Sequence, residues 1–217
     1  MTRRTFIVVL AATCAIAFVC VLPGASIRYP GDDTGYAPKQ PIAFSHALHA
    51  GDLKIDCLYC HSAAERSRHA GIPSPSTCMN CHRFVADRIA NVRAAEARAA
   101  AESRPVEMPV SSEIMKLYAA LGLDRDQKPR AGATPSSIDW VRVHRLPDHA
   151  SFDHSRHVVA GVACRECHGA VESMERVRQV QDLSMGWCLD CHRQKSRELG
   201  PATPALFAGE DCGSCHY

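Results

Sequence analysis

Residues 57–61 have the sequence Cys57-Leu58-Tyr59-Cys60-His61, and the same Cys-x-x-Cys-His pattern occurs four more times in this 217-residue chain. The other copies are Cys78-Met79-Asn80-Cys81-His82, Cys164-Arg165-Glu166-Cys167-His168, Cys188-Leu189-Asp190-Cys191-His192 and Cys212-Gly213-Ser214-Cys215-His216. Two thiols about one helical turn apart can reach both vinyl groups on one porphyrin edge, and the adjacent histidine becomes the proximal iron ligand. The pattern therefore predicts five covalently bound haem c groups, which use ten of the twelve cysteines.

Two other uses of paired cysteines explain the sequence less well. Zinc knuckles have no need of a histidine directly after the second cysteine. Histidine accounts for 12 of 217 residues, so five such histidines by chance have odds of about one in a million. Disulfide pairing in an exported protein also leaves these histidines unexplained. Haem attachment accounts for both residue types.

The N-terminus carries an export element. Arg3 and Arg4 precede residues 6–22, a run of 17 residues without charge that includes the two remaining cysteines, Cys14 and Cys20. This run is longer than an ordinary signal core and just long enough to span a bilayer, and no clear cleavage site follows it. We favour an uncleaved membrane anchor over a cleaved signal in residues 1–25, followed by a linker over residues 26–40. The positive N-terminus then stays in the cytoplasm, and the rest lies on the periplasmic side of a bacterial inner membrane.

The remaining chain has the composition of a globular protein. Hydrophobic residues make up 46% and charged residues 22%, with a formal net charge of +2. These values are typical of a folded body and give no indication of a nucleic-acid partner.

A second motif occurs twice and divides the body into modules. The motif is Phe44-x-His46-x-x-His49 in the first copy and Phe152-x-His154-x-x-His157 in the second. Its first histidine lies 11 residues before Cys57 in the first copy and 10 residues before Cys164 in the second. Each copy is followed by two attachment motifs, which predicts a two-haem module over residues 41–83. A three-haem module covers residues 141–217, and residues 84–140 form a helical insertion and linker.

Seven histidines remain once the five proximal ligands, His61, His82, His168, His192 and His216, are assigned. In each Phe-x-His-x-x-His motif the two histidines lie on one side of a helix and can reach different irons. We predict that the first histidine binds the local haem and the second crosses to another, which makes His46, His49, His154 and His157 distal ligands. For the fifth distal ligand we favour His144, with Met185 and His149 as alternatives, and we expect His69 to be a solvated loop residue.

The predicted fold is mainly α-helical with extensive loops. The two modules supply only about 24 residues for each haem, too few for an ordinary apolar core, so the haems themselves must form the core. Residues 83–104 are predicted to form a helix with Val85, Ile89 and Val92 in a thin apolar stripe. Residues 111–123 are predicted to form a second helix, and we expect little sheet.

Several stretches outside the haem motifs resemble one family. They are Pro41-Ile-Ala-Phe-Ser-His46, Val141-Arg-Val-His144-Arg-Leu-Pro-Asp148 and Asp182-Leu-Ser-Met-Gly-Trp-Cys188. They are similar to the pentahaem cytochrome c subunit of bacterial alternative complex III, a quinol:electron-acceptor oxidoreductase, and more distantly to class III multihaem cytochromes. Residues 84–110 are additional to that pattern. The resemblance implies an anchored periplasmic haem wire whose partners are an iron–sulfur subunit, polytopic quinol-binding subunits and a monohaem cytochrome c.

We therefore expect an electron-transfer subunit with no substrate site of its own, passing electrons from a quinol-oxidising complex towards a cytochrome or terminal oxidase. A free-standing multihaem shuttle is the alternative, and a catalytic multihaem reductase is a third hypothesis. A reductase needs an iron with an open sixth position. Here seven histidines remain as possible distal ligands for five irons, so the sequence does not require an open position.

Overall fold

The computed structural model describes residues 32–199 and 211–216. Contacts divide the chain into Met1–Asp32 and Asp33–Tyr217, so the described residues belong almost entirely to the second unit. The predicted anchor or signal, with Cys14 and Cys20, lies outside the described residues, as do residues 26–31 of the predicted linker. Within the described part of the chain, no helix is both long and apolar enough to cross a membrane.

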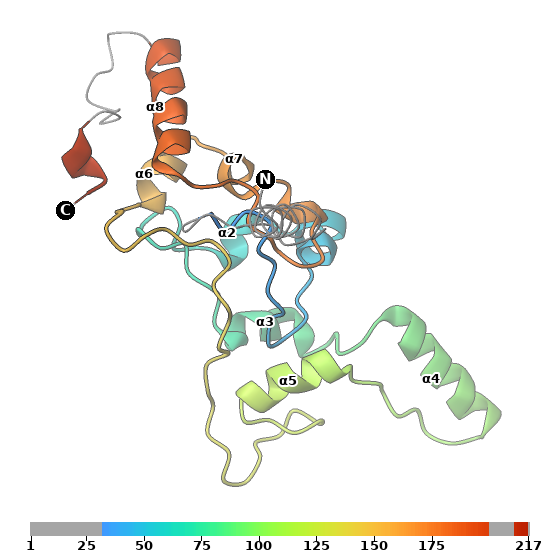
Figure 1. Ribbon diagram of the computed structural model, residues 1–217. Coiled ribbons are helices and arrows are strands. Elements are labelled where there is room, and N and C mark those ends of the chain that lie inside the picture. Colours follow the sequence, from blue (N-terminus) through green and yellow to red (C-terminus); the bar gives the residue numbers. More distant parts are fainter. Residues whose placement is uncertain (1–31, 200–210, 217) are drawn as a thin grey trace, which may run out of the picture. The chain divides into compact units, whose positions relative to one another are not determined.

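Short helices carry the attachment motifs (Figure 1). In chain order, the motifs lie on α2 (Cys57–Cys60), α3 (Pro75–His82), α7 (Cys164–His168), the first half of α8 (Met185–Leu199) and the 3-10 turn η4 (Cys212–Ser214). The two Phe-x-His-x-x-His motifs lead into the π-helix η1 (Ala47–Asp52) and into α6 (His154–Val159). A helical turn places the two cysteines of a motif close together, as attachment to one porphyrin edge requires.

Aspartate caps explain why such short helices begin where they do. The side chain of Asp56 accepts a hydrogen bond from Leu58 N at 2.8 Å, and Asp153 accepts one from Ser155 N at 2.8 Å. Each cap satisfies a backbone N–H that a helix leaves without an internal partner. α7 ends at Gly169, where φ is +69° and a Cβ atom would lie 2.8 Å from Val180 Cγ2. Only glycine fits this exit, which lies directly after the third motif.

Both predicted helices of the insertion are present, but they are shorter than expected. α4 covers Ile89–Ala101 and α5 covers Ser112–Ala120. In α4 the buried side chains are Ala95 and Ala99, whereas Val85 and Ile89 are 55% and 64% exposed. The predicted stripe through Val85 and Ile89 is therefore wrong, because this helix approaches its neighbours through small alanines.

α5 packs against α3 (Figure 1). One buried tyrosine anchors it there. Tyr118 is fully buried, and its hydroxyl donates a hydrogen bond to the backbone carbonyl of His82 at 2.9 Å. Gln127 donates through Nε2 to the same hydroxyl and to the carbonyl of Arg83. The insertion is thereby fixed to the second attachment helix at its proximal histidine.

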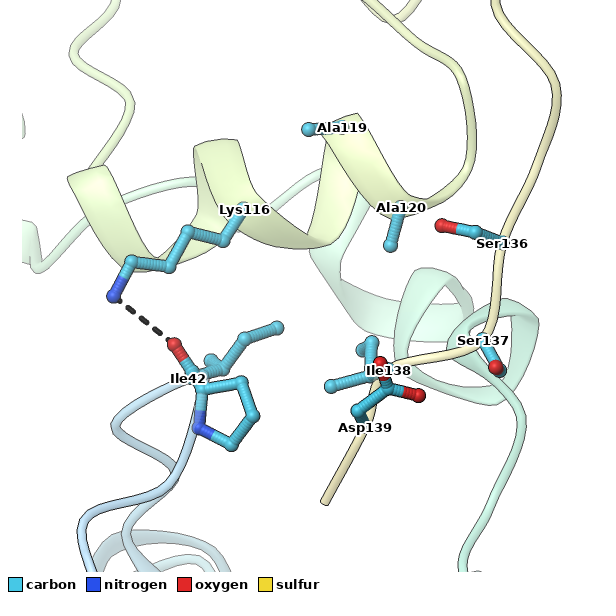
Figure 2. Close-up of a pocket in the computed structure, with 9 residues that line it drawn as sticks. Ile42, Lys116, Ala119, Ala120, Ser136, Ser137, Ile138 and Asp139 are labelled. Carbon is cyan, nitrogen blue, oxygen red and sulfur yellow. Dashed lines mark hydrogen bonds between the residues drawn. The ribbon is translucent and has the colours of Figure 1, made fainter. Parts of the chain in front are cut away.

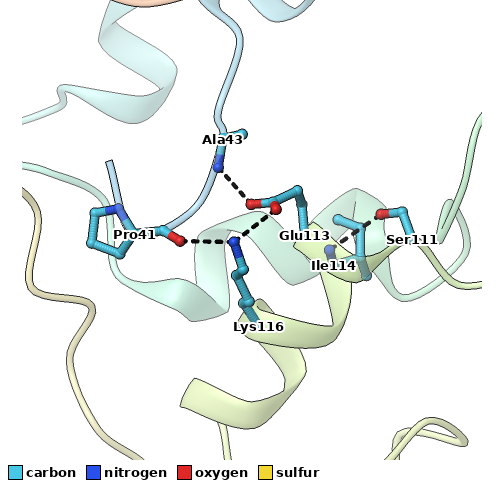
Figure 3. Close-up of polar contacts among 6 residues, drawn as sticks. All are labelled: Pro41, Ala43, Ser111, Glu113, Ile114 and Lys116. Atoms are coloured by element: carbon cyan, nitrogen blue, oxygen red, sulfur yellow. Dashed lines mark hydrogen bonds and ion pairs between the residues drawn. The ribbon is translucent and has the colours of Figure 1, made fainter. Parts of the chain in front are cut away.

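A second polar cluster joins α5 to the segment that leads into the first Phe-x-His-x-x-His motif (Figure 3). The carboxylate of Glu113 accepts hydrogen bonds from Ala43 N and Lys116 Nζ, both at 2.7 Å, and Lys116 also donates to the carbonyl of Pro41 at 3.1 Å. These contacts lower the pKa of Glu113 below its usual value, the hydrogen bond from Lys116 having the largest effect. Glu113 therefore stays ionised at neutral pH and holds residues 41–43 against α5.

Beside this cluster, an open groove of about 550 Å³ separates residues 41–42 from α5 and residues 136–139 (Figure 2). None of the residues that line it is a cysteine or a histidine. The groove is therefore distinct from the haem-attachment motifs.

The buried apolar core of the described residues is small. It consists of Ala64, Ala95, Ala99, Leu117, Tyr118 and Met174. Only Ala64 and Met174 belong to the predicted haem modules. The described residues contain no β-strand, only isolated bridges from Leu123 to Pro129 and from Ala150 to His216. The mainly helical fold predicted from the sequence is therefore confirmed, and the scarcity of apolar core is what haem-centred packing requires.

The contribution of Tyr118 gives a stability prediction. Tyr118→Phe should lower the free energy of unfolding by about 1 to 2 kcal/mol, because the His82 carbonyl loses its hydroxyl donor. Tyr118→Ala should cost about 3 to 5 kcal/mol through the cavity that it leaves. Urea unfolding followed by Soret circular dichroism measures both. Met108→Ala is the control for the cavity, since Met108 is 53% exposed and its effect should stay within about 0.5 kcal/mol. An unfolding free energy of Tyr118→Phe equal to that of the wild type would contradict the anchoring role.

Candidate haem-binding site

Three of the five proximal histidines are held in the tautomer that iron requires. His61 lies with Nδ1 2.7 Å from the carbonyl oxygen of Gly71, and His82 with Nδ1 2.7 Å from that of Val85. His216 makes the same contact with the carbonyl of His149 at 3.0 Å. A carbonyl oxygen only accepts, so each Nδ1 carries the proton and the lone pair of Nε2 is free. Such partners orient metal-binding histidines and raise their basicity.

Three pairs of imidazoles lie at the separation that one iron between them requires. The ring centroids of His49 and His82 are 6.1 Å apart, those of His154 and His168 are 6.3 Å apart, and those of His157 and His192 are 6.1 Å apart. Two metal–nitrogen bonds of about 2 Å each, plus about 1.1 Å from each nitrogen to its ring centre, require about 6 Å. The residues therefore fit bis-histidine haem, with one proximal and one distal ligand in each pair.

Each pair joins one distal candidate to one motif. His154 faces the motif that follows it in sequence, whereas His49 and His157 face the next motif along the chain. The pKa of His46 is lowered to about 4, by burial first and by the neighbouring His61 next. This effect indicates that His46 lies near His61. The structure thus places His46 and His154 beside the motifs predicted for them. It also shows that the motifs facing His49 and His157, which the spacing left unspecified, are the second and the fourth.

The two Phe-x-His-x-x-His motifs have nearly the same local geometry. Phe44 meets His46 edge-on at 4.9 Å and stacks on His49 at 4.3 Å. Phe152 meets its two histidines at 4.8 Å and 4.5 Å in the same orientations. The second histidine of each motif binds through Nδ1 to a carbonyl four residues earlier, at 2.8 Å in both copies. The phenylalanine therefore fixes both rings of its motif.

Each of these motifs docks on the other module. His154 N and Ser155 N donate to the carbonyls of Arg68 and Ser67, which follow the first attachment motif. Ala47 N donates in turn to the carbonyl of Met174, which follows the third motif. In this reciprocal docking, the surroundings of the Phe-x-His-x-x-His motif in each module include backbone from the other module.

The first two attachment motifs are in contact. Tyr59, inside the first motif, accepts a hydrogen bond from Asn80, inside the second, at 2.9 Å. Burial raises the pKa of Cys78, and the nearby thiol of Cys60 raises it further. A cavity of about 260 Å³ is lined by Tyr59 and Cys60 of the first motif and by residues of the segment that leads into the second motif, including Thr77.

The other motifs continue this chain of contacts. After burial, the thiol of Cys164 in the third motif is the next cause that raises the pKa of Cys57, so the first and third motifs lie near each other. Burial and the adjacent thiols of the fourth motif raise the pKa of Cys167 to about 11. Burial also raises the pKa of Cys188, with the thiol of Cys215 in the fifth motif as the next cause. In space the motifs therefore follow the order second, first, third, fourth and fifth.

His144, the favoured candidate for the fifth distal ligand, lies beside a proximal histidine that already has a distal partner. His144 Nε2 is 3.3 Å from His168 Nδ1, and the two rings are perpendicular with centroids 4.3 Å apart. This separation is too short for an iron between them. Burial, with His144 as the next cause, lowers the pKa of His168 to about 4. His144 therefore lies where it can orient a proximal ligand.

His149 lies closer to the remaining proximal ligand. Its ring centroid is 5.6 Å from that of His216, with the planes 21° apart, and its backbone carbonyl contacts Nδ1 of His216. Met185 is 65% exposed at the first position of α8. His69 is exposed, as predicted. The identity of the fifth distal ligand stays a prediction.

Comparisons with known proteins agree with this arrangement. Residues 150–217, which contain the second Phe-x-His-x-x-His motif and the last three attachment motifs, match the family described as cytochrome c7 and related cytochrome c. The chain is similar to multihaem cytochromes c. Over 130 residues it is 28% identical to the multiheme cytochrome c subunit of menaquinone reductase from Nitratidesulfovibrio vulgaris strain Hildenborough. That match covers 60% of this chain and 46% of the relative, so the chain matches less than half of the relative's length.

Sequence reasoning missed two contributors to the site. One is the ring of His144 as a neighbour of His168, and the other is the backbone carbonyl of His149. A backbone acceptor leaves no signal in residue type, so only the fold reveals it. The position of His144 ten residues before His154 gave no indication of a contact with a proximal ligand.

Proposed function

We propose that this chain is a periplasmic electron-transfer subunit that carries electrons through five covalently bound haem c groups. The three imidazole pairs at about 6 Å carry this proposal, because they match the spacing of bis-histidine iron ligation. Bound haem supplies a one-electron Fe(III)/Fe(II) couple at each attachment motif. The protein's own contribution is to fix the ligands, exclude water and keep the motifs in contact.

The contacts between motifs support a continuous route. A hydrogen bond joins the second motif to the first. The thiols of the first, third, fourth and fifth motifs lie near enough to raise the pKa of a thiol in a neighbouring motif, which supports the order second, first, third, fourth and fifth. A route of this kind needs no substrate site and no proton acceptor. We therefore propose that quinol chemistry belongs to partner subunits.

The partners follow from the resemblance and from the relative's name. We propose that the chain is anchored by its N-terminal residues in the bacterial inner membrane and works within a quinol:electron-acceptor oxidoreductase of the alternative complex III type. Its partners would be an iron–sulfur subunit, polytopic quinol-binding subunits and a monohaem cytochrome c. The similar protein from N. vulgaris is named as a subunit of a menaquinone reductase, which supports a membrane complex handling quinones.

The test is to purify the subunit from native membranes in mild detergent. We expect a mass increase of five haems, copurification of the quinol-binding and iron–sulfur subunits, and no carbon monoxide binding by the reduced protein within the mixing time. A catalytic reductase with an open iron would bind carbon monoxide at once. A haem count below five, or quinol oxidation by the isolated subunit at the rate of the complex, would overturn the proposal.

A further inference from the structure

The first distal histidine differs from its three counterparts in one respect. His49, His154 and His157 each place Nδ1 2.8 Å from a backbone carbonyl. His46 Nδ1 is buried and has no hydrogen-bond partner in the described structure. Because protein atoms already enclose this nitrogen, neither a water molecule nor a haem can reach it without movement of its surroundings.

His154 provides a matched comparison, since it holds the same position in the second motif. Both rings meet their phenylalanine edge-on, at 4.9 Å and 4.8 Å. His154 gains the carbonyl of Arg68, which reaches it through the reciprocal docking of the modules. On the other side of that docking, the carbonyl of Met174 accepts a hydrogen bond from Ala47 N, and within the described residues it makes none with His46. The two motifs therefore differ in this single hydrogen bond at the first histidine.

Iron ligation through Nε2 requires Nδ1 of His46 to carry a proton. A buried N–H without an acceptor is destabilising, and detachment of the ring from iron lets that N–H turn towards a partner. In His154 detachment would instead break a hydrogen bond that is already made. The missing acceptor thus favours the detached form of His46 over that of His154 by roughly 5-fold to 100-fold.

We propose that the haem of Cys57 and Cys60 has an exchangeable sixth position, where a small exogenous iron ligand such as cyanide, carbon monoxide or nitric oxide replaces His46. In this exchange the bond between iron and His46 Nε2 breaks and one bond from iron to the incoming ligand forms, with no change in oxidation state. The inference rests on the proposed five-haem assignment. It goes beyond that assignment by naming one haem at which an added ligand can interrupt electron transfer.

Cyanide binding to the oxidised five-haem protein, followed by stopped-flow absorbance, tests this proposal. We expect the wild type to show a slow phase with the amplitude of one haem. In His46→Ala a fast phase of the same amplitude should replace it, because the sixth position is already open. In His154→Ala, the matched control, a fast phase should appear in addition to the unchanged slow phase.

Two results would overturn the proposal: a wild-type slow phase that persists in His46→Ala, or no cyanide binding to the wild type at saturation. Should either variant fail to accumulate, nuclear magnetic resonance of the cyanide-treated wild type replaces it. The first haem methyl signals to shift should then be those with contacts to Phe44 and not those with contacts to Phe152. A haem count other than five would refute the proposed function instead, and it is measured before cyanide is added.

Discussion

Replacement of both Cys57 and Cys60 by alanine is expected to lower accumulation of the whole subunit at least about tenfold, with loss of all five haems. The first motif is central in the contact order, since it touches both the second and the third. The loop that follows it also holds the start of α6 through Ser67 and Arg68. Without the first haem, the haem modules keep little more than Ala64 and Met174 as buried apolar residues, too small a core for folding.

The matched control is the double replacement of Cys212 and Cys215. The fifth motif lies at the end of the contact order and is held to the body by the bridge between Ala150 and His216. A stable four-haem protein is expected from this variant. Haem-stained gels and mass spectrometry of periplasmic extracts measure both variants. Equal yields of four-haem protein from the two would contradict a core made of shared haems.

His157→Ala is expected to convert one of the five low-spin irons into a five-coordinate iron that binds carbon monoxide within the mixing time. The ring of His157 lies 6.1 Å from that of His192, and its Nδ1 is held by the carbonyl of Asp153. Removal of the side chain therefore leaves the sixth position of the fourth haem empty.

The control for this experiment is His69→Ala, at an exposed loop residue that is not among the predicted ligands. All its irons should stay low-spin, and the reduced protein should show the slow carbon monoxide response of the wild type. Electron paramagnetic resonance of the oxidised proteins gives the independent readout. A fully low-spin spectrum of His157→Ala, or a high-spin signal in His69→Ala, would show that these ligand assignments are incorrect.

The attachment motifs and the number of histidines outside them predict much of the candidate site, because covalent haem binding constrains residue type and spacing very tightly. It was also predictable that His49 and His157 reach other haems than His46 and His154 do. In each motif the two histidines are three residues apart on a helical segment, so their side chains point in different directions. Helix existence in the insertion was also predictable. The buried positions of α4 were not predictable, because the burial of its alanines depends on which segments of the chain pack against the helix.

The position of His144 shows where residue patterns stop being informative. Its sequence context supports a rigid turn, but the contact with His168 depends on how segments distant in sequence pack together. The same is true of backbone carbonyls such as that of Arg68, whose place beside His154 follows from module docking across 86 residues. Such acceptors decide how firmly a ligand is held, and any residue type can supply them.

Reciprocal docking of the two repeated motifs has an evolutionary consequence. Because the docking contacts come from the loops at Ser67–Arg68 and Met174, the covalent connection between the repeats is not what aligns them. A gene duplication followed by exchange of these segments produces such an arrangement, and it leaves the joining stretch free to lengthen over generations. Residues 84–140, which contain α4 and α5, occupy that stretch. Related chains should therefore differ most in length there, while the two docking loops keep a constant distance from their attachment cysteines.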